Sequence, residues 1–191
     1  EFQDIPIFSV IEPSARAAIE AVEGVHQPLI GVLATEGTVR GNAYTNVIHK
    51  EMPQATIVSQ ACQLLVALAE EGWTEGKIAS LIVHQYLRGL FEQRHRWPQT
   101  VVLGCTHFPL LVNEIKRAAI ELGATATTII DPSIEIAKTV ANAIGPELQS
   151  GLGKTTYLAT DNPSRFASIG GQFLGQDLES TDIQLVDLKA I

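Results

Sequence analysis

The stretch TVVLGCTHFPLL, Thr100 to Leu111, contains the features that decide the fold. An apolar run of the kind that forms a buried strand ends at Gly104, and a proline-led apolar segment with helical spacing begins at Phe108. A thiol and an imidazole, Cys105 and His107, stand between the two. The stretch therefore predicts a strand, a short turn with reactive side chains, and a helix.

The same order of strand, turn and helix recurs along the chain. Further apolar runs with the composition of strands are LIGVLAT (29–35), ATIVSQ (55–60), ATTIID (126–131), TTYLAT (155–160) and IQLVDL (183–188). Segments with helical spacing follow all but the last, and EGTVRGNAYTNVIHKEM (36–52) is predicted as a single helix. Because strands that alternate with helices indicate a parallel sheet, we predict a three-layer α/β sandwich with a mostly parallel sheet.

Composition limits the classes of function. The chain has 191 residues, 46% of them hydrophobic and 18% charged, which is a globular composition long enough for one full core. The formal net charge of -8 argues against a nucleic-acid partner, since phosphate binding needs clustered Lys and Arg. No apolar run approaches the roughly 18 to 20 residues of a membrane span. We therefore expect a soluble, cytoplasmic protein that binds neither nucleic acid nor a membrane.

Two turns between a strand and a helix are candidates for the functional site, because ligands of open α/β sheets bind beyond the carboxyl ends of the strands. In the GCTH turn, the amides that begin the next helix favour a thiolate at Cys105 and attract a carboxylate, and His107 is close enough to assist. In the ATEGT turn, the hydroxyls of Thr35 and Thr38 form a cradle for a carboxylate or amino group. From the residues alone, Cys105 as a small buried hydrophobe and ATEGT as an ordinary N-cap remain open.

Other polar and sulfur groups give weaker signals. Glu70 and Glu71 close an apolar helix, and we expect one of them to be solvated and the other to reach a cleft and meet a substrate ammonium. Cys62 precedes the apolar run QLLVAL and is interpreted as a core residue. With no second Cys/His pair and no short spacing between the two cysteines, we expect no metal site and no disulfide framework.

Several segments resemble a known family. IPIFSVIEPSARAA, IGVLATEGTVRGNAY, ACQLLVALAEEG and VVLGCTHFPLL are similar, in this order, to signature segments of the bacterial glutamate racemases, within the aspartate/glutamate racemase family. YLATDNPSRFASIGGQFLG and IQLVDL resemble the C-terminal end of that family. The resemblance implies interconversion of L- and D-glutamate without a cofactor, by two cysteines on opposite sides of the substrate. It also implies a supply of D-glutamate for peptidoglycan, and a homo-oligomer, a dimer, in the intact enzyme.

The resemblance also implies roles for single residues. Cys105 matches the second catalytic cysteine of the family, and His107 matches the histidine that assists it and is also expected to bind substrate. The other residues expected to bind substrate match two threonines of the family's turn, the threonine after the cysteine, and a glutamate near the cleft: Thr35, Thr38, Thr106 and Glu70.

The chain also departs from the family pattern. The family usually has Cys-Pro where Cys62-Gln63 stands, Pro where Ala67 stands, and often Ser where Gly41 stands. Its N-terminal DSGVGG-like loop and its CNT-like segment, which carries the first cysteine, have no counterpart here. We therefore expect a fragment that is inactive alone. Its expected parts are the end of a first domain or linker (1–12), the second racemase domain (13–130), and a C-terminal segment of a pseudo-symmetric α/β domain that packs on the first domain (131–191), with GPELQSGLGK (145–154) as candidate linker.

Two alternatives remain open at this point. The chain could be a relative that racemises aspartate or hydantoins, or a truncated, non-catalytic α/β module that binds a partner. The residues quoted above do not decide between glutamate and aspartate.

Overall fold

The computed structural model describes residues 5–145 and 155–187. The chain divides into two compact units, Glu1–Gly145 and Pro146–Ile191. No helix within the described ranges has the length and apolar character that crossing a membrane requires. The candidate linker lies outside the described residues except for Gly145, and the domain boundaries 1–12, 13–130 and 131–191 stay a prediction.

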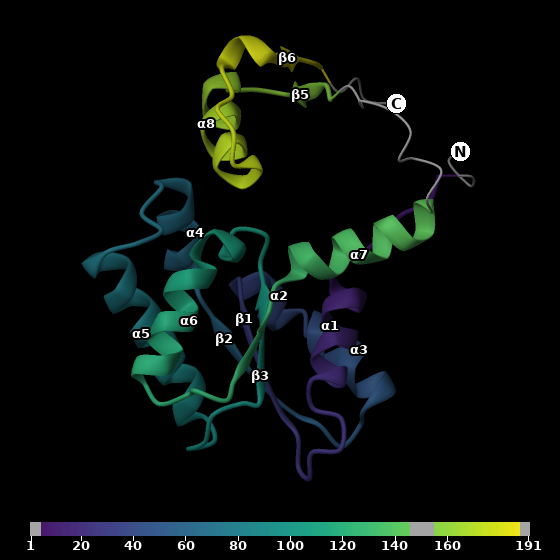
Figure 1. The fold of residues 1–191 in the computed structure, drawn as a ribbon, viewed down its shortest axis with the longest axis vertical. Helices are drawn as coiled ribbons and strands as arrows, with labels where there is room; N and C mark the ends of the chain where they lie inside the picture. The colour runs from purple at the N-terminus through teal and green to yellow at the C-terminus, as the bar shows by residue number, and fades with distance from the viewer. Residues whose placement is uncertain (1–4, 146–154, 188–191) are drawn as a thin grey trace. The chain divides into compact units, whose positions relative to one another are not determined.

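A four-stranded parallel sheet forms the centre of the first unit (Figure 1). The strands stand in the order β2-β1-β3-β4, where β1 is Leu29–Ala34, β2 is Thr56–Ala61, β3 is Thr100–Gly104 and β4 is Thr128–Ile130. Ala34 at the end of β1 pairs with Ala61 on one side and with Gly104 on the other. The three strands therefore end together, at an edge that we call the carboxyl edge.

Helices cover both faces of this sheet. Residues of α1 (Ile11–Glu20) and α3 (Ala43–Glu51) share one core with alternate residues of β1, such as Ile30 and Val32. The other alternate residues, Leu29 and Leu33, share a second core with α4 (Gln63–Glu70), α5 (Lys77–Glu92) and α6 (Val112–Glu121). α7 (Pro132–Ile144) packs on α1. All six residues of β1 are buried, as expected for a parallel strand covered on both faces, and the predicted three-layer α/β sandwich is confirmed.

Three features differ from the elements predicted from sequence. The segment predicted as one helix from Phe108 begins as a 3-10 helix, η1 (Phe108–Leu111), and α6 begins at Val112. The segment 36–52 is two helices, α2 (Glu36–Arg40) and α3, because Asn42 adopts the left-handed conformation (φ 50°) and α3 begins after it. Asparagine is one of the few residues with a side chain that adopts this conformation readily. Helix α1 was not predicted, and its fully buried Ala15 and Ala18 let its backbone approach the sheet closely.

The second unit is a smaller α/β element. Its strands β5 (Tyr157–Ala159) and β6 (Ile183–Leu185) are parallel, and the connection between them contains α8 (Pro163–Leu174) and the short helix η3 (Ser180–Asp182). Asn162 caps α8 by accepting a hydrogen bond from the Arg165 amide at 3.1 Å. This is a strand, helix and strand unit, as the sequence predicted for this region.

Candidate active site

The two turns singled out from the sequence lie side by side at the carboxyl edge. Thr35 directly follows β1 and Cys105 directly follows β3, and the last residues of these strands are paired. A cavity of about 270 Å³ opens here. Its walls come from both turns and from the beginnings of α1, α3 and α7: Val10, Ile11, Thr35, Thr38, Tyr44, Gly104, Cys105, Thr106 and Pro132.

The thiol of Cys105 occupies a half-buried position in this cavity. Burial raises the pKa of the Cys105 thiol, while hydrogen bonds from the backbone amides of His107 and Phe108 act in the opposite direction. The sulfur lies 3.8 Å from Nδ1 of His107. The site therefore keeps a protonated thiol as its resting form, with donors and an imidazole in place to hold the thiolate when it forms.

His107 connects the thiol to Glu70. Its Nε2 lies 3.5 Å from Oε1 of Glu70, which is the last residue of α4, and both side chains are partly exposed. Neither residue is among those that line the cavity. The structure thus places the Glu70 carboxylate against the ring that faces the thiol, and substrate contacts by His107 and Glu70 stay a prediction.

The hydroxyls of Thr35 and Thr38 lie 3.1 Å apart, and both residues line the cavity. Thr35 stands at the N-cap position of α2 with extended backbone (φ -74°, ψ 159°), but its side chain makes no capping hydrogen bond. The interpretation as an ordinary N-cap is therefore wrong for this side chain. Thr106 adds a third hydroxyl to the lining, so four of the six predicted site residues border one cavity.

Tyr44 is a cavity residue that sequence reasoning missed. It is 4% exposed, and burial raises its pKa to about 12, so the phenol is neutral at pH 7. In one continuous helix, Tyr44 and Thr38 would face in different directions, since six residues turn a helix by about 240°. The break at Asn42 brings both to the same cavity, and only the positive-φ tendency of asparagine could have signalled it.

The aromatic ring of Tyr44 also explains the glycine before the catalytic candidate. A Cβ added to Gly104 would lie 2.9 Å from Cε2 of Tyr44 and 3.1 Å from Cβ of Ala34. Such contacts are too short for any side chain, so Gly104 lets β3 end directly against the ring.

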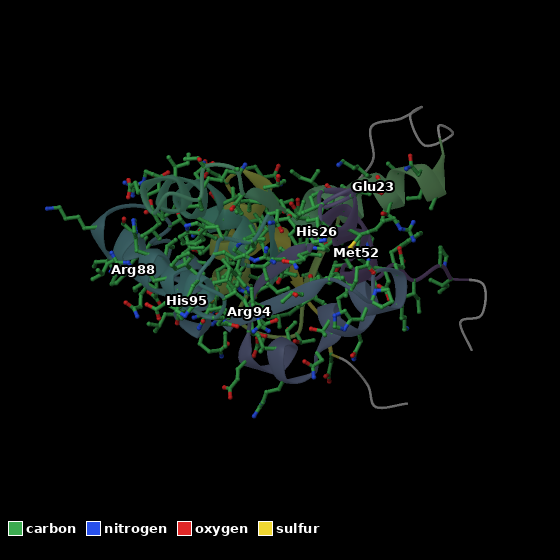
Figure 2. All side chains as sticks on the ribbon, turned by 90° about the horizontal axis from the view of Figure 1, so that it is seen from below. Glu23, His26, Met52, Arg88, Arg94 and His95 are labelled. Carbon is green, nitrogen blue, oxygen red and sulfur yellow. The ribbon has the colours of Figure 1, made fainter. Side chains whose placement is uncertain are left out.

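Other candidates lie away from this cavity. Cys62 is fully buried and donates a hydrogen bond to the Gln60 carbonyl at 3.3 Å, so its interpretation as a core residue is confirmed. His26 and His95 belong to the connections that precede β1 and β3, at the end of the sheet opposite to the carboxyl edge (Figure 2). Neither histidine can act on a ligand held beside Cys105.

Comparisons with known proteins agree with this geometry. Residues 1–140 match the model of the Asp/Glu/hydantoin racemase family. Similar proteins include the glutamate racemases of Geobacter metallireducens, 40% identical over 97% of this chain and 66% of that protein, and of Neisseria gonorrhoeae, 36% identical over 97% and 65%. The chain thus spans slightly less than two thirds of the length of these relatives.

Solved structures of similar fold are also glutamate racemases. Isoform RacE1 from Bacillus anthracis superposes with a TM-score of 0.80 at 31% identity, over 98% of this chain and 66% of that one. The Francisella tularensis enzyme in complex with D-glutamate gives 0.77 at 28% identity, over the same shares. The predicted resemblance is confirmed, and the chain belongs to the Asp/Glu/hydantoin racemase family.

Proposed function

We propose that this protein is a glutamate racemase that interconverts L- and D-glutamate without a cofactor, with Cys105 as one of two thiols that exchange the Cα proton. The observation that carries the proposal is the cavity at the carboxyl edge, which is lined by Cys105 together with Thr35, Thr38 and Thr106. Support comes from the relatives of this chain, which include glutamate racemases and a structure with D-glutamate bound.

The arrangement suits proton transfer at a weakly acidic carbon. The thiolate of Cys105 takes the proton from Cα, so that an S–H bond forms as the C–H bond breaks and the electron pair remains on the substrate. The charge that develops needs preorganised donors in a site that excludes water. The three threonine hydroxyls are such donors, because each can donate a hydrogen bond to a carboxylate of glutamate.

His107 and Glu70 have a supporting part in this proposal. Nδ1 of His107 faces the Cys105 sulfur, so it can accept the thiol proton and return it. The Glu70 carboxylate beside Nε2 stabilises the ring when it becomes positively charged. Glu70 can thus serve the reaction through His107, in addition to the contact with the substrate ammonium that the sequence predicts.

Inversion needs a second acid on the opposite face of the substrate. Among the described residues, Cys105 is the one thiol that borders the cavity, since Cys62 is buried in the core. We therefore place the second thiol in a segment outside this chain, corresponding to the third of the relatives that the match does not cover. By this proposal the 191 residues alone do not racemise glutamate.

The same segment would complete the C-terminal unit. A parallel sheet of two strands is smaller than independent stability usually requires. Large apolar side chains of the unit are exposed, among them Leu158 (51%), Phe173 (43%) and Leu185 (60%). We propose that residues 131–191 pack on this first domain, and that the intact enzyme is a cytoplasmic dimer that supplies D-glutamate for peptidoglycan.

A chimera tests the proposal. The chain is joined to the third of the Geobacter metallireducens racemase that the match does not cover, and the change in circular dichroism of L-glutamate is followed over time. The chimera should racemise glutamate, while the chain alone and the chimera with Cys105→Ser should not. Turnover by the chain alone would contradict the two-thiol mechanism, and a folded chimera that binds glutamate without turnover would contradict the proposed activity.

The family description leaves a second substrate class to test. Because the matching model covers aspartate, glutamate and hydantoin racemases, the same assay is repeated with L-aspartate and with a hydantoin. Faster turnover of either compound would replace glutamate as the substrate while leaving the role of Cys105 intact.

A further inference from the structure

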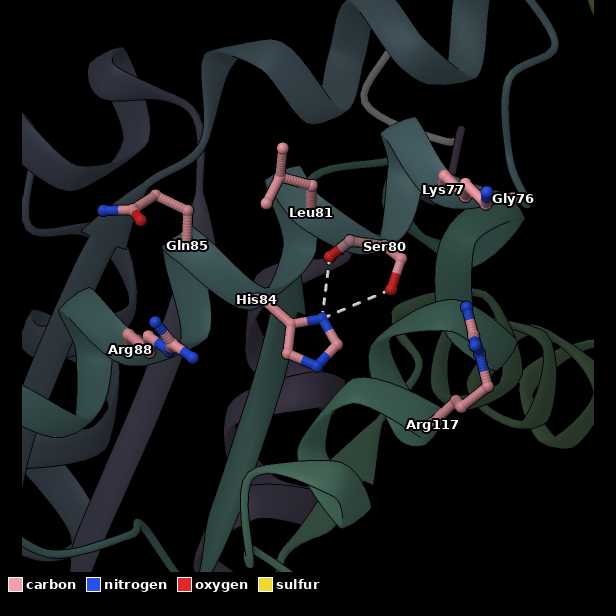
Figure 3. Close-up of a pocket in the computed structure, with 8 residues that line it drawn as sticks. All are labelled: Gly76, Lys77, Ser80, Leu81, His84, Gln85, Arg88 and Arg117. Atoms are coloured by element: carbon pink, nitrogen blue, oxygen red, sulfur yellow. Dashed lines mark hydrogen bonds between the residues drawn. The ribbon is translucent and has the colours of Figure 1, made fainter.

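Helix α5 is fixed to α6 beside a groove of about 500 Å³ that lies between α5 and Arg117 of α6 (Figure 3). In this groove Nδ1 of His84 lies 2.8 Å from the Ser80 carbonyl, and Nε2 of the same ring lies 3.0 Å from a carboxylate oxygen of Glu121, on α6. Buried residues of the two helices also belong to one core cluster. α5 is therefore a firm support for the elements that pack on it.

Tyr86 of α5 supports the start of α4. Its hydroxyl oxygen accepts a hydrogen bond from the Leu64 amide at 3.2 Å, and Leu64 is the second residue of α4. Amides in the first turn of a helix have no acceptor within the helix, so an oxygen from a neighbouring element satisfies one of them here. The position of Gln63, the first residue of α4, is thereby linked to α5.

The side chain of Gln63 extends from α4 to the ATEGT turn. Its Oε1 accepts a hydrogen bond at 3.1 Å from the backbone amide of Glu36, which stands 27 positions earlier in the chain. Glu36 is the first residue of α2, and no residue of α2 is buried. Because packing holds this segment only weakly, the contact with Gln63 is a significant part of what joins it to the rest of the first unit.

This contact suits the unusual state of the Thr35 hydroxyl. A threonine at the N-cap position usually accepts a hydrogen bond from an amide in the first turn of its helix. The Thr35 side chain makes no such bond, and its Oγ1 lies 3.1 Å from Oγ1 of Thr38. Gln63 supplies an acceptor to the first turn of α2 from outside, so the two hydroxyls stay paired at the cavity that both residues line.

We propose that Gln63 is a positioning residue, which holds the ATEGT turn so that the hydroxyls of Thr35 and Thr38 remain at the cavity. Gln63 is not among the residues that line the cavity, so its effect on a bound substrate passes through the turn. The inference rests on the proposed function for one step, in which these hydroxyls bind glutamate. The contact between Gln63 and the Glu36 amide can be tested without that step.

Hydrogen exchange of backbone amides, measured by NMR on the 191-residue chain, tests the contact. Gln63→Met keeps the length of the side chain but has no oxygen acceptor, so exchange at the Glu36 amide should become about 3- to 10-fold faster, the range expected for one hydrogen bond in water. Gln63→Glu keeps an acceptor oxygen at the same reach, and its exchange rate should stay within about twofold of the wild type.

A matched control is available on α5. Gln85→Met makes the same change at another exposed position, in the groove of Figure 3, and should leave exchange at the Glu36 amide unchanged. An unchanged rate in Gln63→Met, or an equal increase in Gln85→Met, would overturn the inference.

Kinetics of the chimera test the consequence for the substrate. Gln63→Met should raise KM for L-glutamate about 3- to 10-fold and leave kcat within about twofold, as expected when a binding contact is weakened equally in the ground state and the transition state. Gln63→Glu and Gln85→Met should keep both constants near those of the wild type. A purely structural role would instead lower kcat through loss of folded enzyme at unchanged KM, and that result would overturn the inference. Absence of turnover in the wild-type chimera would contradict the proposed function, and the exchange rates of the chain would still decide whether Gln63 holds the turn.

Discussion

The two cysteines of this chain occupy equivalent places in the sheet and have different surroundings. Cys62 directly follows β2 and Cys105 directly follows β3, and both strands flank β1 and end at the carboxyl edge. Cys62 is fully buried, and its amide donates a hydrogen bond to the Ala34 carbonyl at 2.8 Å. Cys105 is half-buried and borders the cavity. Position at the end of a strand therefore does not by itself make a thiol available for chemistry.

What separates the two thiols is their neighbours. Cys62 lies in the core cluster that contains Leu65 and Leu68, and its thiol donates a hydrogen bond to the Gln60 carbonyl. The sulfur of Cys105 receives two backbone amides and faces an imidazole. Burial raises the pKa of both thiols, and a backbone hydrogen bond at Ala34 acts in the opposite direction at Cys62, whereas Cys105 has two such hydrogen bonds and an imidazole beside it.

Serine substitution should produce the largest difference between the two positions. In the chimera described above, Cys105→Ser should lower kcat for L-glutamate by at least about 10³-fold, because an alcohol is a far weaker acid than a thiol. Cys62→Ser should leave kcat within about threefold, since its side chain does not reach the cavity. Circular dichroism of the substrate measures both rates, and an equal loss of kcat at the two positions would contradict the different roles assigned to the two cysteines.

Alkylation should separate the thiols by a smaller factor. Iodoacetamide should modify Cys105 at least about 100-fold faster than Cys62, which is exposed only when the first unit opens. Because burial raises the pKa of Cys105, its rate at pH 7 should lie below that of a free thiol and should increase as the pH rises beyond about 8.5. Peptide mass spectrometry measures each site, and a Cys105 rate already maximal at pH 7 would show that the amides outweigh burial.

The sequence alone predicts the two turns and their meeting at the carboxyl edge, but it does not predict all the residues that line the cavity. The strand run before Gly104 and the threonines after Ala34 follow from apolar patterning, and parallel pairing then requires the two turns to meet. Tyr44 reaches the cavity through the break at Asn42, for which the only signal in the sequence is the positive-φ tendency of asparagine. Pro132 reaches it through the packing of α7 on α1, which depends on contacts distant in sequence. Cys62 could be assigned to the core from its apolar neighbours, whereas the placement of Glu70 against His107 results from the packing of α4 near η1 (Phe108–Leu111), between segments distant in sequence.

Substitution of His107 should have a moderate effect on kcat, which tests whether the imidazole acts through the Cys105 thiol. His107→Asn in the chimera should lower kcat about 10- to 100-fold, chiefly in the direction that begins with proton removal by Cys105. Glu70→Gln keeps the shape of the side chain but removes its charge, so it should lower the same direction by a smaller factor. Equal losses in both directions, measured from L- and from D-glutamate, would contradict a role through the Cys105 thiol.

The smallest expected difference between the two cysteines is in the free energy of unfolding. Here substitution of Cys62 should have the larger effect, whereas substitution of Cys105 has the larger effect on activity. Cys62→Ala removes a fully buried sulfur and leaves a small void, which should lower the free energy of unfolding by about 1 kcal/mol. Cys105→Ala acts at a half-buried position beside a cavity, so its effect should stay within about 0.5 kcal/mol. Both tryptophans, Trp73 and Trp97, belong to the first unit, so fluorescence during urea unfolding reports on that unit alone. If Cys105→Ala destabilised the unit more than Cys62→Ala, Cys105 would be a packing residue, and its availability for proton transfer would have to be reconsidered.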